Sequence, residues 1–225
     1  MEYSKASFEP TIGDCYNHGW KSLWKKFLEL FLAGLVILLF SIPINILSIW
    51  IDDYSFTGFI GFYIIFTLGY SIFILQPLQY GMFYMYLKAV RDEKVEVGDL
   101  FAAKENYMNV VLASLLVNFI IGIGIILLII PGIVFACKLA FVPYLVIDKK
   151  MDAIEAMKKS WEMTDGYAMN IFAMGVLAIF IAIGGFIAFL VGVIIAAMWI
   201  YASFASIYYS VDSLQGIDSE LLRDK

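Results

Sequence analysis

Residues 108–147 read MNVVLASLLVNFIIGIGIILLIIPGIVFACKLAFVPYLVI, an apolar run in which Lys138 is the one charged residue. The run is about twice as long as the roughly 20 residues that a helix needs to cross a bilayer, so it cannot cross only once. Pro131-Gly132 predicts where it folds back, because proline suits the first turn of a returning helix and has no N–H group that needs a partner in lipid. We therefore expect two antiparallel helices, at about 108–128 and 131–147.

A second long apolar run, residues 167–209, also exceeds the length of one span. It predicts another pair of helices, with the turn between Gly184 and Gly192. Two further apolar runs lie nearer the N-terminus. Together the four apolar runs predict an all-α polytopic membrane helical bundle of six transmembrane helices in three hairpins. The expected spans are at about 27–50, 57–88, 108–128, 131–147, 168–187 and 189–211.

The composition agrees with a membrane protein and argues against a soluble one. Hydrophobic residues make up 62% of the 225 residues and charged residues only 16%, whereas soluble domains carry about 25% charged residues. No Pro/Ser-rich linker or long charged run separates soluble modules, so we expect residues 1–225 to form a single integral membrane domain. The net charge of -5 says little about partners, because the charges are segregated by loop, and we expect no nucleic acid partner.

Lysine and arginine lie almost entirely on one side of the predicted spans. Of the fifteen, four precede the first span and two follow the last. Four lie at the end of the second span or between it and the third, and four lie between the fourth and fifth spans. The remaining one is Lys138, and the first of the three opposite loops carries Asp52 and Asp53 instead. Because cytoplasmic loops are enriched in lysine and arginine, we expect a multi-pass protein of the cytoplasmic (inner) membrane with both termini in the cytoplasm.

Each predicted hairpin follows an amphipathic segment, which suggests an internal threefold repeat. These segments open with residues 11–14, 96–99 and 152–155. In the first and third, apolar residues recur at helical spacing opposite lysines, a pattern typical of helices that lie in the membrane interface. Tryptophan is enriched at such interfaces, so the predicted interfacial anchors are Trp20, Trp24 and Trp161.

Several short motifs occur together along the chain: Gln76-Pro77-Leu78 with Gly81 and Arg91, Asp99-Leu100-Phe101, residues 127–133 (LLIIPGI), and Asp148 with Ser160-Trp161, Thr164 and Gly166. In this combination the sequence resembles an uncharacterised bacterial family of six-helix integral membrane proteins related to the membrane domain of some glycerophosphodiester phosphodiesterases. It departs from that family in carrying Asp92-Glu93 where Gly-Glu is usual after the arginine. The resemblance covers most of the chain and implies a six-helix membrane fold. It brings no catalytic residues, because the hydrolase domain has no counterpart here.

The sequence offers little material for catalysis. It has one histidine, His18, and two distant cysteines, Cys15 and Cys137, which we expect to be free thiols. It contains no HExxH, GxSxG or Walker motif and no cysteine pair. An intramembrane enzyme needs a converging nucleophile, base or set of metal ligands. We therefore expect a protein that is not an enzyme and that uses neither a metal nor a cofactor.

Four polar residues remain as ligand or pathway candidates: Lys138, Gln76, Asn118 and His18. A charge within an apolar run costs about 2.5–3.5 kcal/mol on insertion scales unless it snorkels or finds a partner. Lys138 therefore reaches the outer interface, bonds an uncharged partner such as Asn45, or serves a ligand pathway. Gln76-Pro77 either kinks an overlong helix or marks a binding site. His18 is either a plain interfacial residue or a contact for a proton or a lipid headgroup.

Two helical faces stand out within the predicted spans. In the fifth span, small residues recur at intervals of three and four: Gly175, Ala178, Ala182 and Gly185. They predict close helix packing, because small side chains let helices approach each other in lipid. Aromatic residues form a stripe along the second span: Phe59, Phe62, Phe66, Tyr70 and Phe73. This stripe either contacts acyl chains or an apolar ligand, or is an ordinary lipid-facing or packed surface.

These features favour a non-enzymatic integral membrane protein that binds lipid or another amphiphile, or that scaffolds a membrane partner. Membrane lipids are the expected partners, and a membrane protein or a second copy of the chain is a further candidate. The alternative is a small-solute transporter or channel that uses Lys138, Asn118 and Gln76 as pathway groups. Bound lipid would favour the first hypothesis, and solute flux the second.

Overall fold

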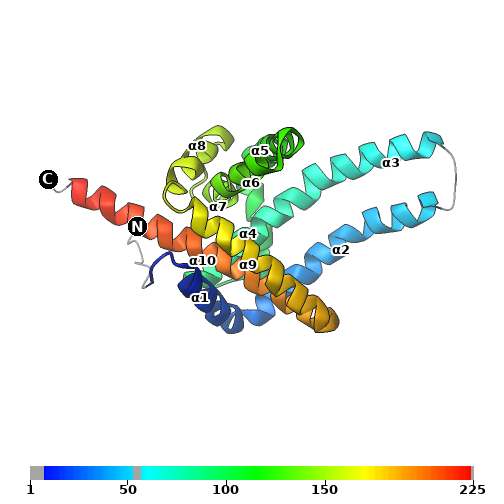
Figure 1. Cartoon of the computed structure of the whole chain (residues 1–225). Helices are drawn as coiled ribbons and strands as arrows, with labels where there is room; N and C mark the ends of the chain where they lie inside the picture. The colour runs from blue at the N-terminus through cyan, green and yellow to red at the C-terminus, as the bar shows by residue number, and fades with distance from the viewer. Residues whose placement is uncertain (1–7, 53–56, 224–225) are drawn as a thin grey trace.

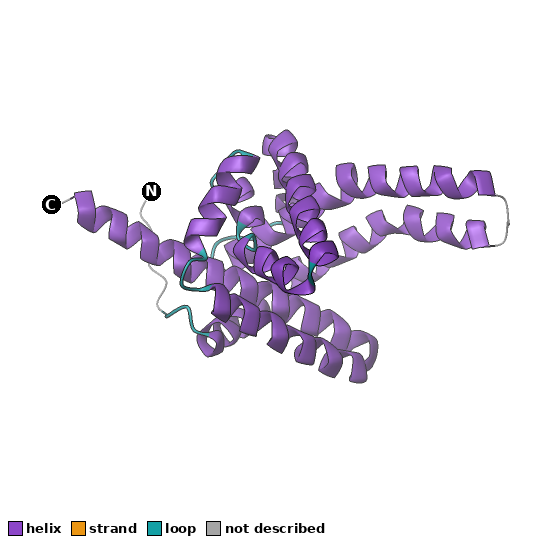
Figure 2. Cartoon of the chain, turned by 45° about the horizontal axis from the view of Figure 1, so that its top comes forward, coloured by secondary structure: helices purple, strands orange, loops and turns teal. Residues whose placement is uncertain are grey.

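The computed structural model describes residues 8–52 and 57–223, in which the chain is helical and contains no strand (Figures 1 and 2). The elements, in chain order, are α1 (Ile12–Lys25), α2 (Phe27–Asp52), α3 (Thr57–Tyr70), η1 (Ser71–Leu75), α4 (Gln76–Val90), η2 (Val97–Asn106), α5 (Tyr107–Leu127), α6 (Ile129–Lys138), α7 (Val142–Asp148), α8 (Ala153–Met163), α9 (Ala168–Ile187) and α10 (Phe189–Arg223). Of these, η1 is a π-helical turn and η2 is a 3₁₀ helix.

Six stretches of this part of the chain are long and apolar enough to cross a membrane. They are Phe27–Ile46, Gly61–Val90, Val97–Leu127, Ile129–Asp148, Ala168–Ile187 and Val191–Gln215. Large apolar side chains on them are widely exposed, for example Ile65 (73%), Ile126 (84%) and Phe186 (78%). In water such exposure costs about 25 cal/mol per Å² of apolar surface, whereas surrounding lipid removes this cost. The chain therefore has the surface of a multi-pass membrane protein.

The packed core lies at one end of the molecule, which we call the base. It is built from α1, α4, α7, α8 and the later part of α10, and its largest buried side chains include Tyr86, Phe141, Met163 and Tyr208. Figure 1 shows the α2–α3 pair and the α9–α10 pair leaving the base in diverging directions. These two pairs therefore share the base and do not pack against each other along their whole length.

The chain reverses between α5 and α6 at Leu128, three residues before Pro131. Leu128 is extended, and its N–H group donates to the carbonyl of Gly124. A Cβ on Gly124 would lie 2.8 Å from the Cα of Gly132, so these glycines let the two helices touch beside the turn. Pro131 lies in the first turn of α6, where a fixed φ and a missing N–H group are tolerated.

The fourth predicted span is not one continuous helix, contrary to the expectation for residues 131–147. α6 ends at Lys138, and α7 follows after a gap of three residues. Pro143 explains the break, because it has no N–H group to continue the helix and its ring crowds the carbonyl four residues earlier. Ser160 of α8 closes the gap: its hydroxyl donates to the carbonyl of Lys138 (2.8 Å) and accepts from the N–H of Phe141 (3.2 Å).

The second span is continuous but irregular at the motif Gln76-Pro77. The π-helical turn η1 ends immediately before it. The carbonyl four residues before Pro77 belongs to Phe73, and this carbonyl accepts a hydrogen bond from the Tyr107 hydroxyl (2.8 Å). An interhelical bond thus satisfies an acceptor that the proline leaves without its usual donor. The motif has a structural explanation of this kind, and it does not require a bound ligand.

The packed face of α9 is offset from the predicted one. The buried or core-packed residues on this helix are Ile171, Met174, Ile181 and Gly185. Ala178 is half-buried, Ala182 is exposed, and nothing lies within 4 Å of a Cβ on Gly175. The predicted close face is therefore wrong at Gly175 and Ala182, because the 3.6-residue helical period places the larger Met174 and Ile181 on the packed side. At Gly185, in contrast, a Cβ would lie 2.6 Å from the Cβ of Ala196.

Candidate functional site

Several residues of the sequence motifs meet at the base, whereas residues 127–133 form the exposed turn between α5 and α6. Gly81 of α4 lies directly against η2, since a Cβ there would overlap the carbonyl of Leu100. Two turns further along α4, Lys88 binds Asp99 at 2.7 Å. Asp99 also accepts from the N–H group of Glu96 in a capping box, so it opens η2 as the sequence predicts. These contacts hold η2 along α4.

Arg91 is the centre of a largely buried ionic cluster at the base. Its guanidinium donates to both carboxylate oxygens of Asp148, at 2.6 and 2.8 Å, and lies 3.7 Å from Asp212. Lys149 binds Asp212 at 3.1 Å, and the Tyr208 hydroxyl donates to Asp148 at 3.3 Å. The cluster therefore connects the end of α4 to the end of α7 and to α10.

The charges of this ionic cluster are matched, with two cations facing two carboxylates. Burial lowers the pKa of Arg91, but the hydrogen bond and the charge of Asp148 outweigh burial, so the pKa lies above its ordinary value. The guanidinium therefore stays charged. In residues 8–52 and 57–223 no group of three or more His, Cys, Asp or Glu side chains is placed to hold a metal ion. The ionic cluster therefore acts as a clamp between α4, α7 and α10.

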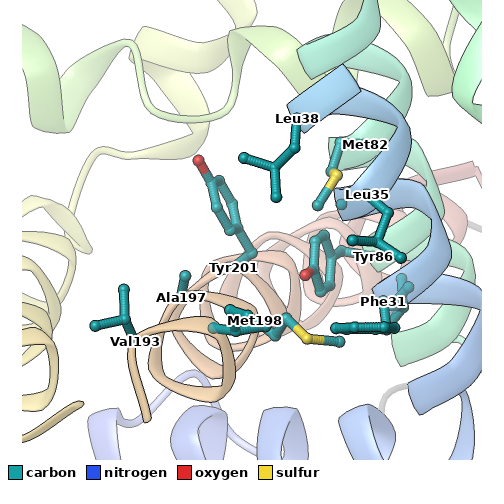
Figure 3. Close-up of a pocket in the computed structure, with 12 residues that line it drawn as sticks. Phe31, Leu35, Leu38, Met82, Tyr86, Val193, Ala197, Met198 and Tyr201 are labelled. Atoms are coloured by element: carbon teal, nitrogen blue, oxygen red, sulfur yellow. The ribbon is translucent and has the colours of Figure 1, made fainter. Parts of the chain in front are cut away.

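An apolar groove, which we call the central groove, lies between α2, α4 and α10 (Figure 3). In Figure 3, Leu35 and Leu38 of α2 stand on one side of it and Val193 and Ala197 of α10 on the other. The cavity has a volume of about 200 Å³. Apart from two tyrosines its lining is apolar, and it consists of Leu30, Phe31, Gly34, Leu35, Leu38, Met82, Tyr86, Val193, Ile194, Ala197, Met198 and Tyr201.

A cavity of about 160 Å³ extends the central groove toward Gln79 and Phe83. The two cavities share four lining residues: Gly34, Leu38, Met82 and Tyr201. The ring of Tyr201 stacks on Tyr86, with centroids 5.5 Å apart, and meets Phe83 edge-on, so its position is fixed. The buried Tyr86 hydroxyl finds no hydrogen-bond partner among the described residues. A mostly apolar groove with a few polar atoms is typical of sites for small apolar or amphiphilic ligands.

Lys138 has a charged partner that the sequence analysis did not predict. Its ammonium group binds Asp165, between α8 and α9, at 2.9 Å and lies 5.6 Å from the centroid of the Trp161 ring. The expected uncharged partner is therefore wrong, and the side chain points to a segment predicted to be cytoplasmic rather than to the outer interface. The break after α6 explains this, because Lys138 ends that helix and α8 docks on its carbonyl. The hydrogen bond and charge of Lys138 lower the pKa of Asp165.

The other three polar candidates lie in different surroundings. His18 of α1 stacks on Phe8, with centroids 4.3 Å apart, and its Nδ1 lies 3.2 Å from the Ser206 hydroxyl of α10. Gln76 is half-buried at the start of α4, and Asn118 is exposed on α5. No hydrogen bond or ion pair between described residues links any of these three to Lys138. The structure does not assemble the four candidates into one polar pathway.

The three predicted interfacial tryptophans are partly exposed. Trp20, Trp24 and Trp161 expose 37%, 49% and 43% of their surface. Trp20 meets Trp199 of α10 edge-on, and Trp24 stacks on Phe27. The opposite face of α1 is packed tightly, since a Cβ on Gly19 would lie 2.7 Å from the backbone nitrogen of Ser203. One packed side and one exposed side suit an indole at a membrane interface.

Sequence reasoning missed the residues that complete these sites. Lys149 follows the end of α7, whereas Tyr208 and Asp212 lie within α10. No spacing in the sequence relates these three residues to Arg91, so the sequence did not indicate that they meet. The central groove was missed because ordinary apolar residues of three separate helices line it. One usable signal was the serine series of the last span, Ser203, Ser206, Ser210 and Ser213, which is buried in the structure. Polar residues at intervals of three and four within a span indicate a helix face that packs on protein.

The comparisons with known proteins found no relative whose function could be compared with these sites. The function must therefore be argued from the central groove, the ionic cluster and the partly exposed tryptophans. Comparison with protein-family models, with curated proteins and with solved structures gave no match.

Proposed function

We propose that this chain is a non-enzymatic integral membrane protein that binds a lipid or another amphiphile in the central groove. The observation that carries the proposal is the groove itself, whose lining is apolar apart from Tyr86, Tyr201 and Gln79. All of its lining residues belong to stretches that are apolar enough to cross a membrane. An acyl chain could therefore enter from the bilayer without passing through water.

The dimensions of the central groove support a ligand with an acyl chain. Its two cavities, of about 200 and 160 Å³, together fall at the lower end of the roughly 300–1,000 Å³ typical of ligand sites. A chain that moves from lipid to protein gains little from the hydrophobic effect, because lipid tails are as apolar as the groove. Selectivity must then come from shape and from the few polar atoms. Tyr201 and Gln79 can offer hydrogen bonds to an ester or a headgroup.

We also infer that the base faces the cytoplasm of a bacterium and that the pairs α2–α3, α5–α6 and α9–α10 enter the inner membrane from that side as hairpins. The one-sided distribution of lysine and arginine supports this orientation. α1, η2 and α8 each precede one pair, and α1 and α8 expose tryptophan opposite a buried face, as interfacial helices do. Both termini would then be cytoplasmic. The arrangement agrees with the resemblance to the six-helix membrane family.

Transport through the interior has less support. Lys138, the cation of the apolar run, is neutralised by Asp165 and lies beside Trp161. The remaining pathway candidates make no polar contact with it in the described part of the chain. Scaffolding of a membrane partner has no specific surface to support it, because lipid alone accounts for the exposed apolar side chains.

The test is to fill the central groove and to measure bound lipid. The full chain, purified in mild detergent, should carry lipid that native mass spectrometry detects. Ala197→Trp places an indole in the groove and should reduce the lipid-bound fraction several-fold. Ala182→Trp makes the same change at an exposed position of α9 and serves as the matched control, because Ala182 does not line the groove.

Three results would contradict the proposal. Equal lipid retention by both variants would place the lipid elsewhere on the protein. A stoichiometric protein partner without lipid would favour scaffolding. Solute flux in liposomes that Lys138→Met abolishes, without bound lipid on the parent protein, would favour transport.

A further inference from the structure

A second apolar groove, which we call the η2 groove, shares no lining residue with the central groove. It has a volume of about 240 Å³ and lies between Phe40 of α2, Phe73 and Pro77 of the second span, and Phe101 and Lys104 of η2. Its aromatic walls are open to the surroundings, because Phe40, Phe73 and Phe101 expose 36%, 55% and 50% of their surface.

Local sequence features fix the walls of the η2 groove. The Tyr107 hydroxyl donates to the carbonyl of Phe73, so the start of α5 is held against the irregular turn that precedes Pro77. Gly81 lets η2 approach the backbone of α4 without a side chain between them. The groove therefore results from hydrogen bonds and backbone contact, and a ligand would meet a surface that is already formed.

Lys104 adds a positive charge to this otherwise apolar lining. Two other lysines near η2 already have carboxylate partners: Lys88 binds Asp99, and Lys150 binds Glu105. Lys104 is exposed and forms no ion pair with the residues that the structure describes. Its ammonium group is therefore available to an anion that approaches along the groove.

We propose that the η2 groove binds one anionic phospholipid of the cytoplasmic leaflet. The acyl chain lies against Phe40, Phe73 and Phe101, and Lys104 pairs with the phosphate or acidic headgroup. An apolar groove alone accepts any lipid, and a lysine alone attracts any anion, but the two side by side favour an amphiphile with negative charge. The choice of leaflet rests on the cytoplasmic orientation given under the proposed function.

The position of Lys104 in the chain suits this ligand. Lys104 precedes the third predicted span (108–128), in the segment whose lysines and arginine support the cytoplasmic orientation. An anionic headgroup of that leaflet can therefore reach its ammonium group.

The test uses the full chain reconstituted in vesicles of phosphatidylcholine and phosphatidylglycerol in equal amounts. After gentle extraction, mass spectrometry counts the two lipids that remain on the protein. The parent chain should retain phosphatidylglycerol in preference, and Lys104→Gln should reduce this preference about fivefold, the effect of one basic residue near an anionic surface. Lys104→Arg should keep it. Lys21→Gln, at an exposed lysine of α1 that does not line the groove, should change it far less.

Each other outcome overturns the assignment. Equal losses in Lys104→Gln and Lys21→Gln would show a general charge effect without a site. No preference in the parent would exclude selection of an anionic lipid. Displacement of the lipid by soluble glycerol phosphate would show that free phosphate is the ligand. Ala197→Trp separates the two proposals: if it leaves all lipid in place while Lys104→Gln still removes phosphatidylglycerol, the central groove fails and the η2 groove stands.

Discussion

Arg91 and Asp148 face each other in a two-pronged ion pair, with N–O distances of 2.6 and 2.8 Å, although 57 positions separate them in the sequence. The arginine follows α4 and the aspartate ends α7. Both belong to the motifs on which the family resemblance rests. Their role in the structure is therefore to fasten two spans together at the base, where Asp212 and Tyr208 join them from α10.

Loss of this pair should destabilise the protein strongly. Arg91→Ala leaves Asp148 with only 10% of its side chain exposed and without its main partner, and removal of one member of a buried pair costs about 3–5 kcal/mol. Arg91→Lys keeps the charge but loses the two-pronged geometry, so an intermediate loss is expected. Thermal unfolding in detergent measures the effect. Lys25→Ala, which breaks an ion pair with 58% and 62% exposed side chains, is the control and should change nothing measurable.

Ser160 should be needed for the break between α6 and α7. Ser160→Ala removes the acceptor for the N–H group of Phe141 and the donor to the carbonyl of Lys138. The Thr164 hydroxyl also donates to the carbonyl of Lys138 (3.3 Å), so the N–H group of Phe141 is the one left unpaired. An unpaired buried polar group costs about 1–3 kcal/mol, so a clear fall in melting temperature is expected. Ser41→Ala, which removes a bond within α2 only, is the control. Similar melting temperatures for both variants would show that water or a backbone shift replaces the Ser160 bonds.

Much of the fold could be predicted because run length and proline position act locally. The apolar runs are too long for one span, and the second one turns at Ala188, inside the predicted interval from Gly184 to Gly192. Cys15 and Cys137 are free thiols, as expected. Gly166 has a φ of +83°, a conformation that favours glycine, but α8 ends earlier, at Met163, so Gly166 shapes the turn before α9 and does not cap α8.

The rest could not be predicted because it depends on which helices meet. Pro143 breaks the fourth span only where Ser160 of another helix satisfies the groups that the break leaves open. Asp165 neutralises Lys138 across 27 positions, and no periodicity in the sequence relates the two. The grooves exist because diverging helices leave a space between them, and divergence depends on tertiary packing rather than on composition.

The packed face of α9 predicts opposite results at two of its small residues. Gly185→Leu should destabilise the protein, because a Cβ there already lies 2.7 Å from the carbonyl oxygen of Gly192, and overpacking costs about 1–3 kcal/mol. Ala182→Leu should be tolerated because Ala182 is exposed. Thermal stability and elution in detergent measure both. A stable Gly185→Leu variant would mean that α9 and α10 separate more easily than their contact suggests.

His18 should make stability depend on pH in the acidic range. Burial, followed by the charges of Lys25 and Lys21, lowers the pKa of His18 below its ordinary 6.5. The unfolded chain then binds a proton more readily than the folded one, so stability is complete above pH 6.5 and falls as the pH drops below that value. His18→Gln should flatten the difference in melting temperature between neutral and acidic buffer. Parallel curves for the parent and the variant would contradict a partly buried histidine that is neutral in the folded chain.

The turn between α5 and α6 presents only apolar side chains. Ile126, Leu127, Leu128, Ile129 and Ile130 expose 84%, 72%, 67%, 68% and 75% of their surface. The two helices that meet at this turn differ in length: α5 has 21 residues and α6 has ten, or about 31 and 15 Å at 1.5 Å per residue, so neither carries the turn much farther than the roughly 30 Å of a bilayer core. The turn satisfies its own backbone, because the N–H of Leu128 donates to Gly124 (3.0 Å) and the N–H of Gly132 to Leu128 (3.4 Å).

We therefore expect this turn to lie in hydrocarbon rather than in water. In a chain whose Cys15 and Cys137 are replaced by alanine, Leu128→Cys should react slowly with a membrane-impermeant maleimide added to either side of sealed vesicles. Lys94→Cys, at a position whose side chain is 85% exposed, should react quickly from one side, and detergent should make the two rates similar. Fast reaction of Leu128→Cys from the side opposite to Lys94→Cys would show instead that α5 and α6 cross the whole bilayer.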